Sequence, residues 1–176
     1  GYEGMLESSS TYLKALNSVL TEGLPSPEIQ VHGWLEIGDL YEDLGKYDST
    51  AYAFQKAVDL CQKFQLDNHL LKGYALIKQA RIIWVIGDYE SASLKLEEAE
   101  EIIPEDHPYS ALILQRQSWI LRRTGAAQAA LDQAMEATRM LPPQHPYVSD
   151  INITLANAYI IKGQHENALE ILRSFL

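Results

Sequence analysis

Residues 34–47 read WLEIGDLYEDLGKY, a stretch that contains most of a helix and the point where the helix ends. Large apolar side chains at Trp34, Ile37 and Tyr41 recur every three or four residues, which is the spacing of one face of an α-helix. Gly45 follows Leu44, at a place where many helices end in a left-handed conformation. The stretch therefore predicts an amphipathic helix that ends in a tight glycine turn.

The turn glycine has counterparts at regular distances along the chain. Four glycines share this context and are separated by 42, 38 and 38 residues: Gly45, Gly87, Gly125 and Gly163. An amphipathic stretch lies before each of them and a second one lies after it. Self-similarity at a fixed period is typical of repeat architectures, so the sequence predicts a series of helix–turn–helix pairs.

The size of the side chains is also repeated when positions are counted from each glycine. Small side chains stand seven residues before it and five residues after it: Gly38, Ala80, Ser118 and Ala156, and Thr50, Ala92, Ala130 and Ala168. Mostly large apolar side chains stand nine residues after it: Phe54, Leu96 and Leu172, with Ala134 as the exception. We expect the small positions to mark the places where two helices approach closely.

With Ala51, Phe54 and Ala57, residues 34–47 resemble a tetratricopeptide repeat. The spacing exceeds the usual length of about 34 residues and is similar to that of the longer repeats of kinesin light chains. The resemblance implies an all-α fold, a right-handed superhelical array of antiparallel helix pairs (an α-solenoid) with about nine helices. In this family the first helices of successive pairs line an inner groove, and catalysis normally resides in another domain, so no enzyme activity is expected.

Prolines and turn signals divide the chain into one repeat domain with several parts. We expect an N-terminal helix, either a cap or the second half of a truncated repeat, in residues 1–24. Four repeats are expected at 27–66, 67–106, 107–144 and 145–176, the last of them truncated. The chain starts without methionine and ends on an apolar run, which suggests a fragment of a longer protein.

The composition excludes several classes of function. The formal net charge of −10 argues against nucleic-acid and acidic-lipid partners, because both require positive potential. No apolar run reaches the length of a membrane span, and the single cysteine, Cys61, has no partner for an internal disulfide. Gly33 and Gly38 have the spacing of a phosphate-binding loop, but Asp39 stands in place of its lysine. We expect a cytoplasmic protein without metal or cofactor.

Basic and aromatic residues gather on the first helices of the second and third repeats, although the chain as a whole is acidic. The groove-facing candidates are Lys78, Arg81, Trp84, Arg116, Trp119, Arg122, Arg123 and Asn157. Arginine and tryptophan are typical of binding hot spots, and positive charge here would attract an acidic peptide or a carboxylate. The alternative is that the arginines pair with neighbouring acidic helices and that the tryptophans fill the core between repeats.

These features predict a protein-interaction module that binds a peptide or helix of a partner, which could be acidic, in the inner groove. The second interpretation is a ligand-sensing or self-association arm of a larger signalling ATPase or transcription regulator. A peptide groove should be open, whereas a small-molecule sensor should contain an enclosed pocket. Self-association is expected through the apolar C-terminal residues, which are Ile171, Leu172, Phe175 and Leu176.

Overall fold

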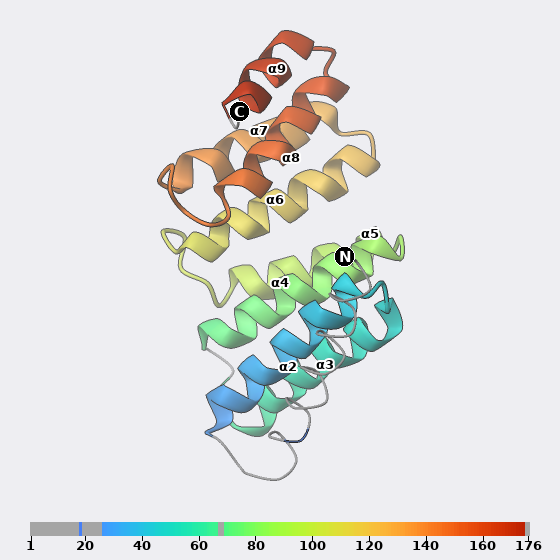
Figure 1. The fold of residues 1–176 in the computed structure, drawn as a ribbon, viewed down its shortest axis with the longest axis vertical. Coiled ribbons are helices and arrows are strands. Elements are labelled where there is room, and N and C mark those ends of the chain that lie inside the picture. Colours follow the sequence, from blue (N-terminus) through green and yellow to red (C-terminus); the bar gives the residue numbers. More distant parts are fainter. Residues whose placement is uncertain (1–17, 19–25, 67–68, 175–176) are drawn as a thin grey trace, which may run out of the picture.

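A computed structural model describes residues 18, 26–66 and 69–174, and within these ranges it contains eight helices (Figure 1). Their bounds are α2 Pro27–Asp43, α3 Tyr47–Lys63, α4 Leu70–Val85, α5 Tyr89–Glu100, α6 Pro108–Arg123, α7 Ala127–Met140, α8 Val148–Ile161 and α9 His165–Arg173. Apart from Ser18, the residues of the helix expected in 1–24 lie outside the described part of the chain, as do Phe175 and Leu176.

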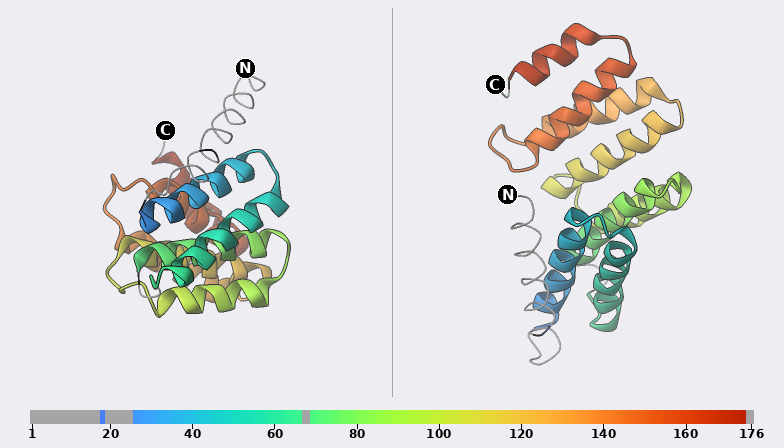
Figure 2. Two further views of the ribbon diagram at one scale, coloured as in Figure 1. Left: turned by 90° about the horizontal axis from the view of Figure 1, so that it is seen from below. Right: turned by 45° about the vertical axis from the view of Figure 1, so that its right-hand side comes forward.

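The helices form antiparallel pairs that are stacked along the long axis of the molecule (Figure 1). The first helices of successive pairs (α2, α4, α6 and α8) contact one another directly, whereas the described second helices contact only first helices. Figure 2 shows the two layers from the side, with α2 and α8 on one side and α3 and α7 on the other. Because the first helices lie closer together, they form the inner layer of a curved array. The expected all-α solenoid of helix pairs is thus confirmed.

The turns between paired helices have the predicted backbone conformation. All four turn glycines have positive φ, with values of 68° at Gly45, 93° at Gly87, 87° at Gly125 and 73° at Gly163. A side chain at Gly87 would meet no neighbouring atom, so space does not require glycine there. Glycine is favoured because L-residues with a side chain rarely adopt this left-handed conformation.

Histidines lie just before three of the first helices, α4, α6 and α8. The Nδ1 atom of His69 accepts a hydrogen bond from the backbone N–H of Leu71, and His107 does the same for Tyr109. His145 Nδ1 accepts the backbone N–H of Tyr147 in the corresponding linker. Each imidazole therefore satisfies a backbone donor near the start of a first helix.

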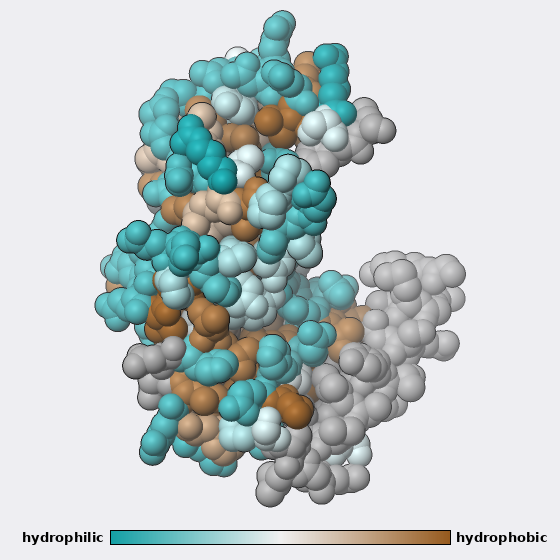
Figure 3. All heavy atoms as spheres, turned by 90° about the vertical axis from the view of Figure 1, so that its left-hand side faces the viewer, coloured by the Kyte–Doolittle hydropathy of each residue, from teal (hydrophilic) through white to brown (hydrophobic). Residues whose placement is uncertain are grey.

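Small residues lie where helices within a pair approach each other. Thr50, Ala92, Ala130 and Ala168 are all buried, with exposed fractions of 0–2%. At one of these contacts the Ser118 hydroxyl on α6 donates a 2.7 Å hydrogen bond to the backbone carbonyl of Ala130 on α7. The sequence register based on small side chains therefore matches the packing. One side of the array is shown in Figure 3, where hydrophobic residues are exposed in patches among hydrophilic ones.

Two alanines on α7 provide a matched test of this register. Ala130 is buried and its neighbour Ala129 is exposed. We expect Ala130→Leu to lower the free energy of unfolding by about 1–3 kcal/mol through overpacking, and Ala129→Leu to change it by less than about 0.5 kcal/mol. Urea denaturation followed by circular dichroism would measure both variants. Equal effects at the two positions would contradict the observed packing of α7 on α6.

Candidate functional site

A pocket of about 290 Å³ opens on the inner layer between α4, α6 and α8. We call it the arginine–tryptophan pocket; it is lined by Arg81, Trp84, Gln115, Arg116, Trp119, Arg122, Asp150, Ile153, Thr154 and Asn157. Six of the eight residues singled out in the sequence are among these: Arg81, Trp84, Arg116, Trp119, Arg122 and Asn157. Lys78 and Arg123 do not line it.

The two tryptophans form the centre of a stack of rings and guanidinium groups. Trp84 on α4 and Trp119 on α6 contact each other with 5.1 Å between ring centroids. The guanidinium carbon of Arg116 lies 3.9 Å from the centroid of the Trp119 ring, and that of Arg123 lies 5.7 Å from the Trp84 ring. Cation–π contacts of this kind hold the arginines in place without neutralising their charge. Arg123 therefore belongs to the site through Trp84.

Hydrogen bonds from α8 hold Trp119 in position. The indole Nε1 of Trp119 donates to the Thr154 hydroxyl at 2.9 Å, and Gln115 Nε2 donates to the same oxygen at 3.1 Å. The Thr154 hydroxyl in turn donates to the backbone carbonyl of Asp150. Neither Gln115 nor Thr154 is among the binding residues predicted from the sequence. These two residues are polar and uncharged, whereas the corresponding positions of the other repeats are apolar or charged. This difference could have identified them from the sequence.

The basic residues nearest the N-terminal pair are neutralised by carboxylates. Lys78 Nζ lies 2.7 Å from a carboxylate oxygen of Asp39, and Arg81 lies 2.9 Å from Glu42. Burial raises the pKa of the Glu42 carboxyl, while Arg81 and then Lys78 act in the opposite direction. The alternative of ion pairing with an acidic helix is therefore realised for Lys78 and Arg81.

Arg116, Arg122 and Arg123 differ from this pair. Within residues 26–66 and 69–174, no carboxylate oxygen lies within ion-pair distance of their guanidinium groups. Burial lowers the pKa of Arg116 to about 9, and the positive charge of Arg81 lowers it further. Burial, together with Arg123, also lowers the pKa of Arg122. The Arg116 Nε is inaccessible to solvent and has no hydrogen-bond partner.

The cost of the Arg116 charge leads to a prediction about stability. With a pKa of about 9, Arg116 is protonated at neutral pH in both the folded and the unfolded state, but burial makes its positive charge less favourable in the folded state, so the charge disfavours folding. We expect Arg116→Met, which keeps an unbranched side chain against Trp119, to raise the free energy of unfolding by about 1 kcal/mol. Arg139→Met on α7 is the control, because Arg139 is exposed and paired with Glu136. A loss of stability in Arg116→Met would contradict this prediction, because it would show that other groups compensate the Arg116 charge in the folded state.

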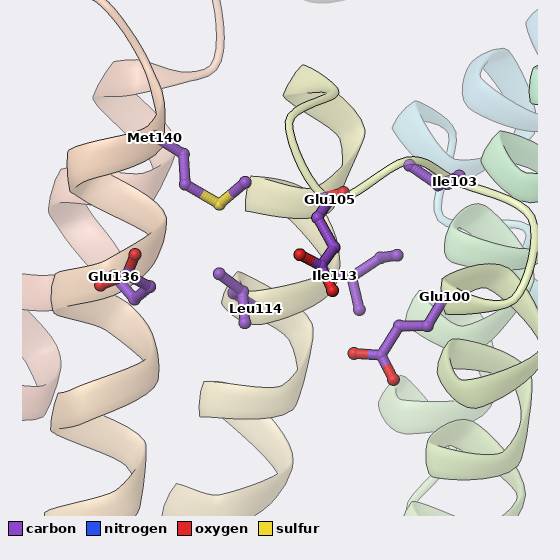
Figure 4. Close-up of a pocket in the computed structure, with 8 residues that line it drawn as sticks. Glu100, Ile103, Glu105, Ile113, Leu114, Glu136 and Met140 are labelled. Carbon is purple, nitrogen blue, oxygen red and sulfur yellow. The ribbon is translucent and has the colours of Figure 1, made fainter.

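A second hollow, of about 530 Å³, lies between α5, α6 and α7 on the other side of the array (Figure 4). Glu100, Glu105 and Glu136 surround its apolar residues, among which are Leu114 and Met140 (Figure 4). Two of the three carboxylates already have partners, because Gln117 donates to Glu100 and Arg139 pairs with Glu136. None of the described residues that line this hollow has a buried side-chain polar atom without a hydrogen-bond partner, in contrast to Arg116 and Trp84 in the arginine–tryptophan pocket.

The described residues contain no group of three or more histidine, cysteine or acidic side chains that could hold a metal ion. None of their helices is both long enough and apolar enough to cross a membrane.

Comparisons with known proteins agree with this architecture. The tetratricopeptide repeat family matches residues 31–64 and 149–176. No curated protein sequence matches the chain significantly.

Several solved structures share the fold. BtubC (BKLC) from P. vanneervenii superposes with a TM-score of 0.73 at 16% identity, over 98% of this chain and 72% of that one. A putative kinesin light chain of Podosopora anserina with TPR-like repeats gives a TM-score of 0.62 at 19% identity, over 97% and 91% of the two chains. YrrB, described as a TPR protein with an unusual peptide-binding site, gives 0.52 at 18% identity, over 97% and 77%.

The family match falls on the first and last helix pairs, and the structure repeats the same pair between them. The positive-φ turn glycines and the small residues between paired helices recur in all four pairs. The chain thus contains tetratricopeptide repeats in its first and last helix pairs, and the helix pairs between them have the same architecture.

Proposed function

We propose that this chain is a protein-interaction module whose inner layer binds an acidic segment of a partner protein at the arginine–tryptophan pocket. The observation that carries the proposal is Arg116, a guanidinium without a carboxylate partner among the described residues whose Nε has no hydrogen bond. A buried donor without a partner costs about 1–3 kcal/mol, and a bound carboxylate would remove that cost. The tetratricopeptide fold supports this role because it is a scaffold for protein interactions.

The surroundings of Arg116 fit a peptide better than an enclosed small ligand. The pocket is open on the inner layer and its two tryptophans provide flat apolar surfaces beside the charge. Trp84 Nε1 is a second buried donor without a partner. A peptide with a hydrogen-bond acceptor beside an apolar group could bind the unpartnered donors and pack against the tryptophan rings.

Selection from a random phage-displayed peptide library tests the proposal. We expect the wild-type chain to enrich peptides that contain aspartate or glutamate, because these supply the missing acceptors. The double variant Arg116→Met/Arg122→Ala should lose those peptides, and Arg139→Ala, on the outer layer, should retain them. Enrichment of peptides without acidic residues, or unchanged selection by the double variant, would contradict the proposal.

Self-association is a second candidate, favoured by the last helix pair. Leu172 is 40% exposed, whereas Phe54, Leu96 and Ala134, which stand at the same position of the earlier pairs, are fully buried. Ile153 is 48% exposed, although its counterparts Leu35, Ile77 and Gln115 are at most 3% exposed. In the earlier pairs the next pair helps to cover these positions, so the α8–α9 face has the character of an interface.

Sedimentation velocity would test self-association through this face. We expect the chain to dimerise with rising concentration and Leu172→Asp to shift it to monomer by introducing a charge into the contact. Leu94→Asp is the matched control, because Leu94 is equally a leucine on a second helix and is 57% exposed. A wild-type chain that remains monomeric at high concentration would rule out this candidate.

A further inference from the structure

The arginine–tryptophan pocket has more positive charge than one carboxylate can balance. Arg81 lines it but is paired with Glu42, so its charge is already compensated. Arg116 and Arg122 line it without a carboxylate partner among the described residues, and Arg123 lies against Trp84 at its edge. Asp150 is the only carboxylate among the lining residues that the structure describes. Three arginines therefore face one carboxylate.

Among the described residues that line the arginine–tryptophan pocket, two of the three buried side-chain polar atoms without a hydrogen-bond partner are donors. Arg116 Nε and Trp84 Nε1 are both buried and both lack an acceptor. The indole Nε1 of Trp119 is already satisfied by Thr154, so it does not compete for a ligand. Gln115 Oε1 is an acceptor without a partner, but the amide nitrogen of the same side chain is held by Thr154. The ligand must therefore supply several acceptors in a small volume.

From this balance we infer that the pocket binds a phosphorylated side chain, a phosphoserine or phosphothreonine, within the partner segment. A phosphate ester has a charge of about −1.5 to −2 at neutral pH and three strong acceptor oxygens, whereas a carboxylate has one charge and two oxygens. Arginine groups recognise phosphate through paired hydrogen bonds. The cation–π contacts with Trp84 and Trp119 hold two of these arginines in advance. The inference rests on the proposed function and specifies the ligand of the same site.

Degenerate peptide pools that differ only in their central residue test this inference. Labelled pools with central phosphoserine, glutamate or serine are titrated with the wild-type chain, and fluorescence anisotropy reports binding. We expect the phosphoserine pool to bind at least about tenfold more tightly than the glutamate pool, because of its larger charge and extra acceptor oxygen. The serine pool should bind most weakly.

Variants with opposite expected effects locate the binding to this pocket. Arg122→Ala should weaken phosphoserine binding, and Asp150→Asn should strengthen it, because it removes the carboxylate that repels the ligand. Arg139 lies on α7 outside the pocket, so Arg139→Ala should leave phosphoserine binding unchanged. Loss of binding in Asp150→Asn would overturn the inference, since it would make this carboxylate a contact for the ligand.

The remaining outcomes separate the inference from the proposed function. Equal binding of the glutamate and phosphoserine pools would overturn the phosphate inference and leave the acidic-peptide proposal intact. Absence of binding for both pools would count against the proposed function as well. Inorganic phosphate that displaces the phosphoserine pool as effectively as an unlabelled phosphopeptide would show that the site is for the free anion and would overturn the peptide assignment.

Discussion

Replacing Leu96 by alanine is expected to lower the free energy of unfolding by about 2–5 kcal/mol. Leu96 on α5 is completely buried within the main hydrophobic core, so the shorter side chain leaves a cavity that its neighbours fill only in part. Leu94 stands two residues earlier on the same helix and is 57% exposed. Leu94→Ala should change stability by less than about 0.5 kcal/mol.

Thermal and urea denaturation of the two variants would measure this difference. The pair is closely matched because it compares the same substitution on the same helix, so differences in helix propensity and in the unfolded chain largely cancel. A comparable loss at both positions would mean that α5 is rotated about its axis relative to the structure described above. Such a rotation would also expose Ala92, which is completely buried on the same helix.

The second large effect is expected at Gly38, where a single added methyl group should destabilise the protein. In an exposed helix, replacing glycine by alanine usually stabilises by up to about 1 kcal/mol. Here an added Cβ would overlap the ring of Phe54, which is itself fully buried. We therefore expect Gly38→Ala to lower the free energy of unfolding by about 1–3 kcal/mol, a change of sign caused by overpacking.

A double-mutant cycle with Phe54→Leu would test the cause. Leucine lacks the outer ring atoms that the new Cβ approaches, so Gly38→Ala should be less costly in the Phe54→Leu background than in the wild-type chain. The same denaturation measurements provide all four stabilities. An unchanged cost in the two backgrounds would place the clash elsewhere, and a stabilising Gly38→Ala variant would show that the two helices can separate at no cost.

The sequence predicted where the pocket residues lie better than it predicted which charged residues form ion pairs. Counting from the turn glycines brought Trp84, Arg116 and Trp119 to one inner surface, and the structure confirms that they lie together. The same counting placed Lys78 and Arg81 on this surface but left open whether they are free or paired with acidic residues. The structure pairs them with Asp39 and Glu42 on α2. Each pair joins residues about one repeat apart, which only the stacking of the helix pairs brings into contact.

Local chemistry determined the elements of this fold by itself. Apolar side chains recurring every three or four residues specify helices, and glycines such as Gly45 specify the left-handed turns between them. Small residues such as Ala130 specify where paired helices approach. All of these are short-range signals, and their repetition at 42 and 38 residues made the solenoid predictable without coordinates.

Only the tertiary structure decided which charges remain without partners. Arg81 and Arg116 occupy neighbouring positions on adjacent first helices, yet Arg81 contacts Glu42 and Arg116 lies over the Trp119 ring, with no carboxylate within ion-pair distance among the described residues. The difference depends on distances of a few ångströms between helices and on how deeply each side chain is buried, because Coulomb energy and desolvation change steeply over that range. A one-dimensional pattern contains neither quantity, and for this reason only the packing of the helices shows which arginines of the pocket lack a carboxylate partner.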